Sequence, residues 1–414
     1  MQRLSVNRLQ PGIFISLAHV GWVRHPFLLN EFRISSDRQI QVLKEMGMVE
    51  IPWDPERSTA VPLPEKTVAE PAGEADFGAA ALAGMLDEKK QRIERVRRQR
   101  ERLARREREY DEEISAATDI LKNLGPKPVE AHGAALQLAT RIVDGLMGAE
   151  NVVIQLMSQK VREAGLAFHS VNVMVLSLLL GKAAGLSAEE MKFLGVGALL
   201  HDAGKQEIPP RILRAPTRTP PEEEFYRAHV GYGIKAVAGV RNMAVPARNI
   251  IACHHERWDG SGFPNKLAGD KIPRLARIVA LANHYDNLCN PFHLQEARTP
   301  SEALSHLFKK EAAAFDPELL QRFVKVLGIY PPGTFVTLSN GAIGLVVETH
   351  PSHLLQPLVM LYDADIPRHE ALMLDLKDAE LSVEKTMNPA QLPLAVVEYL
   401  APRGRIDYSI EGAP

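Results

Sequence analysis

The chain has 414 residues, of which 45% are hydrophobic and 24% are charged, and its formal net charge at pH 7 is −2. This composition is typical of a globular protein with room for two or three domains, and its balanced charge favours neither a nucleic acid nor an anionic membrane as partner. The two cysteines, Cys253 and Cys289, are too few for a disulfide framework and indicate a reducing cytoplasm.

No segment of the sequence predicts a signal peptide or a membrane span. The N-terminus leads into no long apolar segment, and the longest largely apolar run, 173–180, is far shorter than the ~20 residues that cross a bilayer. We therefore expect a cytoplasmic protein without a transmembrane helix.

Residues 1–58 predict a small α/β domain, in which short β-like runs alternate with turn residues. A helix is predicted from Ser36 to Met46, because Ser36 can cap it and apolar residues recur there at three-residue steps. The same domain contains Trp22 and His25, which could form a ligand site. Packing of their rings inside a small domain is the interpretation that we favour.

Residues 59–83, rich in proline, alanine and glutamate, predict a linker, and residues 84–125 predict a long charged helix. Apolar residues recur along this helix at alternating steps of three and four, which is the spacing of a coiled-coil seam. We expect the helix to dimerise the protein and to join the N-terminal domain to the next one; an intramolecular helical hairpin is the alternative. The seam residues are Ile93, Val96, Leu103, Tyr110, Ile114, Ala117, Leu121 and Leu124.

Residues 129–330 predict a helical domain. One helix is predicted over 154–161, and a later one, 168–184, is apolar nearly all round, as expected at the centre of a bundle. His169, near the start of that central helix, does not fit a purely hydrophobic environment. By itself such a histidine is usually satisfied by a hydrogen bond, so its role depends on the polar residues that follow.

Residues 331–400 predict a small β appendage. Strands at 336–338 and 343–347 flank an Asn-Gly turn sequence, and a third strand is predicted over 358–362. After about residue 401 we expect a loose tail. The predicted fold class is mainly α, with a small α/β domain before the helical domain and a β appendage after it.

Side chains suited to metal-assisted chemistry are concentrated between His201 and Asn283. An adjacent His-Asp pair supplies a neutral nitrogen and a carboxylate that can bridge two cations, and a ligand set without thiolates favours Mn, Fe, Zn, Co or Ni over a structural zinc–sulfur site. A lone His-Asp pair is usually structural, but the ordered series here is highly specific. The residues are His169, His201, Asp202, Lys205, His229, His254 and His255.

The whole series resembles an HD-GYP domain, the branch of the HD metal-dependent phosphohydrolase superfamily associated with cyclic di-GMP. The likeness covers roughly residues 150–350, and the segment 22–32 resembles the small uncharacterised domain that often precedes HD-GYP domains. The resemblance implies an all-helical HD-type bundle. The matching pieces are His201-Asp202-Ala203-Gly204-Lys205, 208–213, His229 with Gly233, 254–264, Ile272-Pro273, 276–278, Asp286, Phe315-Asp316-Pro317 and 336–341.

The resemblance implies a metal-dependent phosphodiesterase that hydrolyses cyclic di-GMP to pGpG or GMP in bacterial second-messenger signalling. It implies two divalent ions, Fe or Mn, that share Asp202, with Lys205 contacting a phosphoryl oxygen. The loop of Gly262, Phe263 and Pro264 is expected to border the substrate, since glycine-rich turns let the backbone approach a ligand. The implied metal ligands are His169, His201, Asp202, His229, His254, His255 and Asn283. The expected partners are cyclic di-GMP, a second copy of the chain through the coiled coil and signalling proteins.

The sequence departs from the family pattern at four places. Asn283 stands where the family has its last aspartate ligand, and Gly165 stands where some members carry a glutamate for a third metal. Phe263 replaces the tyrosine of Gly-Tyr-Pro, and the segment 290–292, Asn-Pro-Phe, replaces Arg-Pro-Tyr. The alternative function is therefore a degenerate HD-GYP protein that binds cyclic di-GMP or partner proteins without efficient hydrolysis. Phosphohydrolysis of another nucleotide is a weaker third possibility.

Overall fold

The computed structural model divides the chain into two compact units, each treated by itself. The first unit comprises Met1–Leu103, Phe335–Leu345 and Leu358–Leu400, and the second comprises Ala104–Thr334, Val346–Pro357 and Ala401–Pro414. The described residues are 2–20, 25–27, 30–64, 77–149, 151–157, 165–349, 353–364, 366–379, 381–401 and 405–413.

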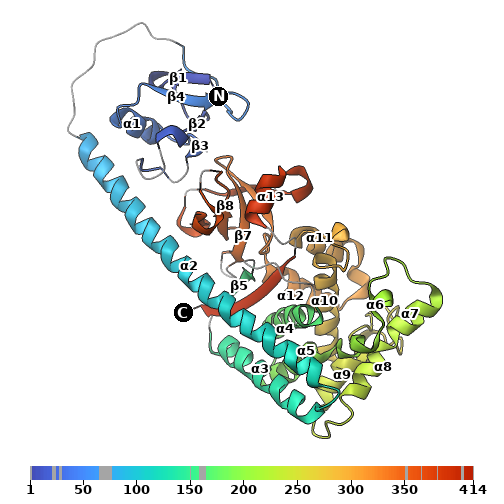
Figure 1. Cartoon of the computed structure of the whole chain (residues 1–414). Coiled ribbons are helices and arrows are strands. Elements are labelled where there is room, and N and C mark those ends of the chain that lie inside the picture. The colour runs from blue at the N-terminus through green and yellow to red at the C-terminus, as the bar shows by residue number, and fades with distance from the viewer. Residues whose placement is uncertain are drawn as a thin grey trace. The chain divides into compact units, whose positions relative to one another are not determined.

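A four-stranded antiparallel sheet with one helix forms the N-terminal part of the first unit (Figure 1). The predicted helix is confirmed as α1 (Asp37–Glu45), with Ser36 before it and buried apolar residues on one face, although Ser36 makes no side-chain capping bond. The strands, in sheet order, are β1 (Gln2–Ser5), β4 (Glu50–Asp54), β2 (Phe14–Ser16) and β3 (Glu31–Arg33).

His25 is fully buried in this small domain. Its Nε2 lies 3.0 Å from Asn30 Oδ1, and its ring centroid is 6.0 Å from that of Phe27. These contacts fit the favoured packing role of His25. The other residue of the possible ligand site, Trp22, lies outside the described residues.

The β appendage also belongs to the first unit, and its predicted strands are confirmed. Strand β6 (Phe335–Leu338) pairs with the first part of β7 (Ile343–Thr349), and Gly341 takes a φ of 82° in the turn between them. Glycine adopts a positive φ without strain, which explains why the Asn-Gly sequence predicted the turn of this hairpin correctly. The remaining elements are β8 (Leu358–Leu361), β9 (Met373–Asp375), β10 (Val383–Met387) and α13 (Leu394–Leu400).

The predicted long helix is α2 (Phe77–Asn123), which would be about 70 Å long at 1.5 Å per residue. The seam residues in its C-terminal part are buried in the apolar core of the second unit, where α2 packs beside α3 (Pro128–Gly148). This part therefore follows the helical-hairpin alternative. For the N-terminal part the coiled coil stays a prediction, and the side chains of Ile93 and Val96 lie outside the described residues.

Helix α4 (Leu166–Ala183) is the centre of the helical bundle in the second unit (Figure 1). It is long and apolar enough to cross a membrane by length and composition, but 72% of that window is buried inside the protein. It packs against α5 (Ala188–Leu200), α10 (Arg274–Cys289) and α12 (Pro317–Leu327). The shorter elements are η4 (Ala203–Glu207), α6 (Pro210–Leu213), α7 (Pro220–Arg227), α8 (His229–Ala236), α9 (Val245–Cys253) and α11 (Pro300–Lys310).

Two predictions for the second unit are wrong. Residues 151–157 form strand β5 (Asn151–Met157) rather than the start of a helix, and the expected loose tail contains strand β11 (Asp407–Ala413). The two strands pair antiparallel over seven residues, and β5 also pairs with the end of β7 at Thr349 and Glu348. The run Val-Val-Ile in β5 is β-branched and buried, which favours a strand. The prediction of a mainly α chain with small sheets before and after its helical part is confirmed.

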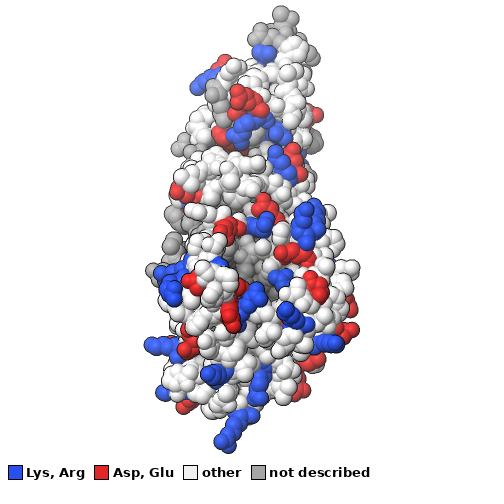
Figure 2. All heavy atoms as spheres, turned by 90° about the vertical axis from the view of Figure 1, so that its right-hand side faces the viewer, with Lys and Arg blue, Asp and Glu red and all other residues white. Residues whose placement is uncertain are grey.

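Charged side chains of both signs are interspersed on the face of the molecule shown in Figure 2. Lysine or arginine side chains adjoin aspartate or glutamate side chains over much of that face. The pattern agrees with a formal net charge of −2 and gives this face no extended field of one sign.

Candidate metal centre

The His201-Asp202 pair follows directly on α5 and is fully buried. The next turn, η4, touches α8 so closely that a Cβ on Gly204 would lie 2.0 Å from the carbonyl oxygen of His229 and 2.4 Å from the amide nitrogen of Gly233. Only glycine allows this approach. The approach places Asp202 beside the first residue of α8, His229.

Asp202 lies between two sets of imidazole nitrogens. Its Oδ2 is 3.2 Å from His169 Nε2 and 3.3 Å from His201 Nε2. Its Oδ1 is 3.4 Å from His229 Nε2 and 3.5 Å from His254 Nε2. Each carboxylate oxygen thus faces its own pair of histidines, which is the arrangement required of a carboxylate that bridges two cations.

His255 completes the second set. Its Nε2 lies 3.1 Å from His229 Nε2, and His229 Nε2 is also 3.4 Å from His254 Nε2. The ligand atoms within each set lie within 4.8 Å of one another. The two sets, which could each hold a metal ion, are Asp202 with His229, His254 and His255, and Asp202 with His169 and His201.

The other ring nitrogen of four of these histidines is already bonded. Nδ1 of His201, His229 and His254 lies 2.7, 2.6 and 3.0 Å from the carbonyl oxygen of the residue three positions earlier. Nδ1 of His169 lies 2.7 Å from Asp286 Oδ2. Because a carbonyl or a carboxylate can only accept, each Nδ1 carries a proton and donates it. A neutral ring then presents its Nε2 lone pair toward Asp202, as metal-binding histidines do.

The arrangement leaves buried polar atoms without hydrogen-bond partners among the described residues. These atoms are His169 Nε2, His201 Nε2 and both carboxylate oxygens of Asp202. The Lys205 ammonium offsets part of the Asp202 charge, but the neutral imidazoles still direct lone pairs at this carboxylate, an arrangement that a cation between them would stabilise. The donor set, all nitrogen and oxygen, therefore fits divalent transition-metal ions.

The protonation states agree with this fit. Burial lowers the pKa of His201 to about 4 and that of His229 to about 3, and burial with the nearby His254 lowers the pKa of His255 well below its usual range. These imidazoles are neutral at pH 7, which is the form that binds metals. Burial alone would raise the pKa of Asp202, but Lys205 and His201 hold it well below its usual range.

His169 differs from the other histidines. Burial alone would lower its pKa, but the two carboxylates beside its ring, Asp202 and Asp286, raise the pKa to about 9. In the metal-free protein His169 therefore holds a proton between the two carboxylates at neutral pH. A divalent ion at this position would displace that proton.

Lys205 reaches the centre from η4. Its Nζ lies 2.5 Å from Asp202 Oδ2 and 5.6 Å from the ring centroid of Tyr226, and its side chain is mostly buried. Burial would lower the pKa of this ammonium, but Asp202 raises it, so the group keeps its charge. The structure thus brings Lys205 to Asp202, and its contact with a phosphate stays a prediction.

Asn283 is buried on α10, but its described hydrogen bonds stay on that helix. Its Oδ1 and its carbonyl oxygen accept hydrogen bonds of 2.7 and 2.8 Å from Asn287 Nδ2. Within the described part of the chain, no hydrogen bond joins Asn283 to Asp202 or to the histidines. Its role as a ligand stays a prediction.

The loop of Gly262, Phe263 and Pro264 contacts the centre through His255. The rings of Phe263 and His255 stack with centroids 4.5 Å apart, and Phe263 N donates a 3.1 Å hydrogen bond to the His255 carbonyl. A Cβ on Gly262 would lie 2.5 Å from that same carbonyl oxygen, so the glycine permits the contact. The structure therefore shows that the loop supports His255, whereas a contact of the loop with substrate stays a prediction.

Two carboxylates that match the family pattern, Glu256 and Asp286, have supporting roles that the sequence did not predict. Glu256 is buried and accepts hydrogen bonds of 2.7 and 2.8 Å from the amides of Asn265 and Leu267, which fixes the loop. Asp286 orients His169. Its position three residues after Asn283 puts it on the same face of α10, and this spacing is the signal that could have identified it.

Two family models match this chain, one over its N-terminal residues and one over the residues of the candidate centre. A family model described as an HD domain matches residues 151–319, which contain all of the histidines and Asp202 of the candidate centre. A second family model, described as a domain of unknown function (DUF3391), matches residues 1–133.

Three relatives are named as phosphodiesterases. The chain is similar to the cyclic di-GMP phosphodiesterase PA4108 of Pseudomonas aeruginosa, at 28% identity over 87% of this chain and 85% of that protein. Similarity to the cyclic di-GMP phosphodiesterase response regulator RpfG of Xanthomonas campestris is 30% identity over 51% of this chain and 58% of that protein. Similarity to the 3'3'-cGAMP-specific phosphodiesterase 2 of Vibrio cholerae is 34% identity over 33% of this chain and 27% of that protein.

Proposed function

This chain belongs to the HD-GYP branch of the HD domain family, and from that premise we propose that it is a metal-dependent phosphodiesterase that hydrolyses cyclic di-GMP to pGpG or GMP in bacterial second-messenger signalling. The observation that carries the proposal is the convergence of four histidines on the two oxygens of buried Asp202, with a fifth, His255, beside His229. Such a centre is built to hold cations next to a substrate phosphate.

We propose that two divalent ions, Fe or Mn, share Asp202. Bound there, they would supply Lewis acidity and a nucleophilic hydroxide at neutral pH. His169 and His201 would complete one site, with Asn283 as a weaker donor. The three histidines of the other set would complete the second site.

The side chains around the ligands contribute orientation and charge. The carbonyls that accept from the Nδ1 groups hold the histidine rings in the metal-binding tautomer. Lys205 carries a buried positive charge beside Asp202, from where its ammonium would stabilise the charge that develops on a phosphoryl oxygen. Phe263, stacked on His255, would border the substrate.

Cyclic di-GMP is the proposed substrate because PA4108, which matches over 87% of this chain, is named as a cyclic di-GMP phosphodiesterase. The cGAMP-specific relative shares a shorter stretch, and its name points to the same class of cyclic dinucleotide. The alternative, a degenerate protein that binds without efficient hydrolysis, is motivated by Asn283 and the Asn-Pro-Phe segment at 290–292.

We propose a cytoplasmic homodimer that associates through the N-terminal half of α2. Exposed ion pairs one turn apart, such as Arg97 with Glu101 and Arg98 with Glu94, are typical of the solvated face of a coiled coil. Light scattering of the full chain tests the dimer: a monomer at micromolar concentration would contradict it.

The function is tested by turnover of cyclic di-GMP and cGAMP in protein loaded anaerobically with Fe(II) or Mn(II), with the metal content measured on the same sample. We expect linear product from cyclic di-GMP, loss of that product in His201→Ala, and retention in Ser177→Ala, a control about two turns along α4 from His169. Binding of the nucleotide by metal-loaded protein without any product would favour the degenerate alternative.

A further inference from the structure

A group of buried polar side chains leads from His169 to the C-terminal strand. Asp286, which is 1% exposed, accepts the Nδ1 proton of His169 on its Oδ2 at 2.7 Å. Its Oδ1 accepts from Asn172 Nδ2 at 3.0 Å and from Asn290 Nδ2 at 2.9 Å. With both oxygens bonded, Asp286 cannot turn without breaking these bonds, so it fixes the direction of the His169 ring.

The two asparagines also bind the backbone at the start of β11. Asn172 donates to the carbonyl of Ile406 at 2.9 Å and accepts from the amide of Tyr408 at 2.9 Å. Asn290 donates to the same carbonyl at 2.7 Å and accepts from the amide of Ile406 at 2.8 Å. Each asparagine thus donates from its Nδ2 both to the carboxylate and to the strand, and accepts from a strand amide on its Oδ1. The position of Asp286 therefore depends on the strand.

Strand β11 is held firmly where it meets these residues. It pairs with β5 over seven residues, and the hydroxyls of Tyr408 and Tyr285 lie 2.9 Å apart in a fully buried contact. Tyr285 is the neighbour of Asp286 on α10. The strand therefore contacts α10 through a side chain as well as through its backbone.

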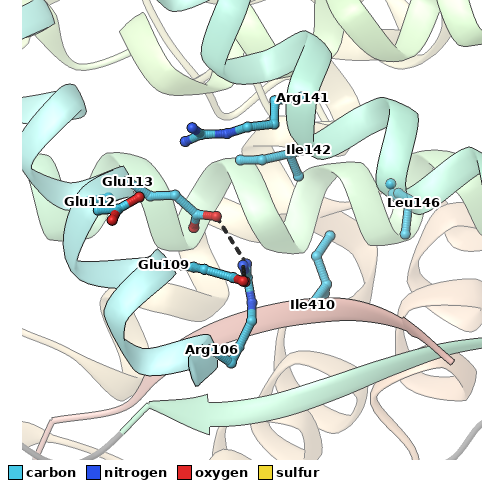
Figure 3. Close-up of a pocket in the computed structure, with 9 residues that line it drawn as sticks. Arg106, Glu109, Glu112, Glu113, Arg141, Ile142, Leu146 and Ile410 are labelled. Atoms are coloured by element: carbon cyan, nitrogen blue, oxygen red, sulfur yellow. Dashed lines mark hydrogen bonds and ion pairs between the residues drawn. The ribbon is translucent and has the colours of Figure 1, made fainter. Parts of the chain in front are cut away.

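Helix α2 contacts the next residue of the strand, Ser409. Arg106 Nε donates to Ser409 Oγ at 2.5 Å, while its Nη1 and Nη2 donate to Glu109 and Glu113 at 2.9 and 3.0 Å. Arg106 is only 8% exposed, and it lines a groove of about 380 Å³ together with Glu113 and Ile410 (Figure 3). A buried arginine with three charge-assisted or hydroxyl partners has little freedom to move, so α2 and β11 are joined rigidly here.

We propose that the C-terminal strand β11 is a positioning element for the metal ligand His169, acting through Asn172, Asn290 and Asp286, and that Arg106 connects this element to α2. The inference rests on the proposed function, because His169 is a proposed ligand there. A carboxylate that accepts the second ring proton of a metal-binding histidine sets its tautomer and direction. Here that carboxylate is itself set by a strand more than 100 residues away in sequence.

The inference is tested by equilibrium titration of the full chain with Mn(II), counting ions and measuring each affinity. Asn290→Ala is the main variant, since Asn290 is only partly buried and its loss frees Asp286 and Ile406 together. We expect a roughly 10- to 100-fold weaker affinity for one ion and an unchanged affinity for the other. Asn172→Ala should act in the same direction, and Ser409→Ala should give a smaller loss while leaving the backbone contacts in place.

The control variant must lower the stability of the fold without changing the hydrogen bonds among Asp286, the two asparagines and β11. Leu186→Ala serves, because Leu186 is buried in the same core but follows the opposite end of α4 from His169. We expect Leu186→Ala to lower the thermal midpoint and to bind both ions as tightly as the wild type. If Asn290→Ala and Ser409→Ala also bind both ions as tightly as the wild type, the positioning role is overturned while the proposed function stands. A wild-type chain that binds no Mn(II) would overturn both.

Discussion

The contact between η4 and α8 allows a sharp prediction for Gly204→Ala. The new Cβ would lie 2.0 Å from the His229 carbonyl oxygen and 2.4 Å from Gly233 N, and both of these atoms belong to the backbone. To accept it, η4 and α8 must separate by about 1 Å, a forced repacking that typically costs ~1–3 kcal/mol of unfolding free energy. The same separation lengthens the 3.4 Å contact between Asp202 and His229, so we expect metal affinity to fall roughly 10- to 100-fold.

The assay is Mn(II) titration combined with urea unfolding of the metal-free protein. Gly231→Ala is the matched control, because Gly231 lies on α8, the helix that Gly204 contacts, with no heavy atom within 4 Å of the added Cβ. The control should bind Mn(II) normally and gain stability of about 0.5–1 kcal/mol from helix propensity. A Gly204→Ala protein that binds both ions with wild-type affinity would refute the reasoning.

Three further predictions follow from the centre and its support. In EDTA, the pKa of His169 is raised to about 9, so its charged ring stabilises the fold fully below its usual pKa of 6.5, and this contribution is lost as the pH rises to 9. The free energies of urea unfolding of wild type and His169→Gln should therefore converge over that pH range. A difference that stays constant would contradict this. Asn283→Asp restores a carboxylate and should tighten Mn(II) binding by roughly tenfold, whereas an unchanged isotherm would remove Asn283 from the proposed ligands. Glu256→Gln weakens two charge-assisted hydrogen bonds to loop amides and should lower the free energy of urea unfolding by ~1–3 kcal/mol. An unchanged free energy of unfolding would show that the loop does not depend on the Glu256 carboxylate.

The candidate centre was largely predictable because most of its candidate metal ligands are adjacent in the sequence. His201 and Asp202 stand together, as do His254 and His255, and few other chemistries use that combination in that order. The supporting contacts were not predictable in the same way. Glu256 sits inside the motif, but its role depends on how the loop folds back on it.

The main errors in the fold concern β5 and β11. The apolar pattern of residues 151–157 is compatible with a buried helix or a buried strand, and periodicity cannot distinguish the two in a short run. The deciding partner, residues 407–413, is about 250 positions away and looks like a tail on its own. The β-branched residues of this run favour a strand, but the pairing that fixes it is a tertiary contact that local periodicity does not report.

The proposed metal centre depends most on a single carboxylate, that of Asp202, shared by two metal ions. Electron paramagnetic resonance of the Mn(II)-loaded protein tests this directly, because two Mn(II) ions about 3.5–4 Å apart and bridged by a carboxylate are magnetically coupled. We predict the spectrum of a coupled pair in the wild type and its loss in Asp202→Ala. A wild-type spectrum of isolated Mn(II) ions, at full loading, would contradict the shared centre.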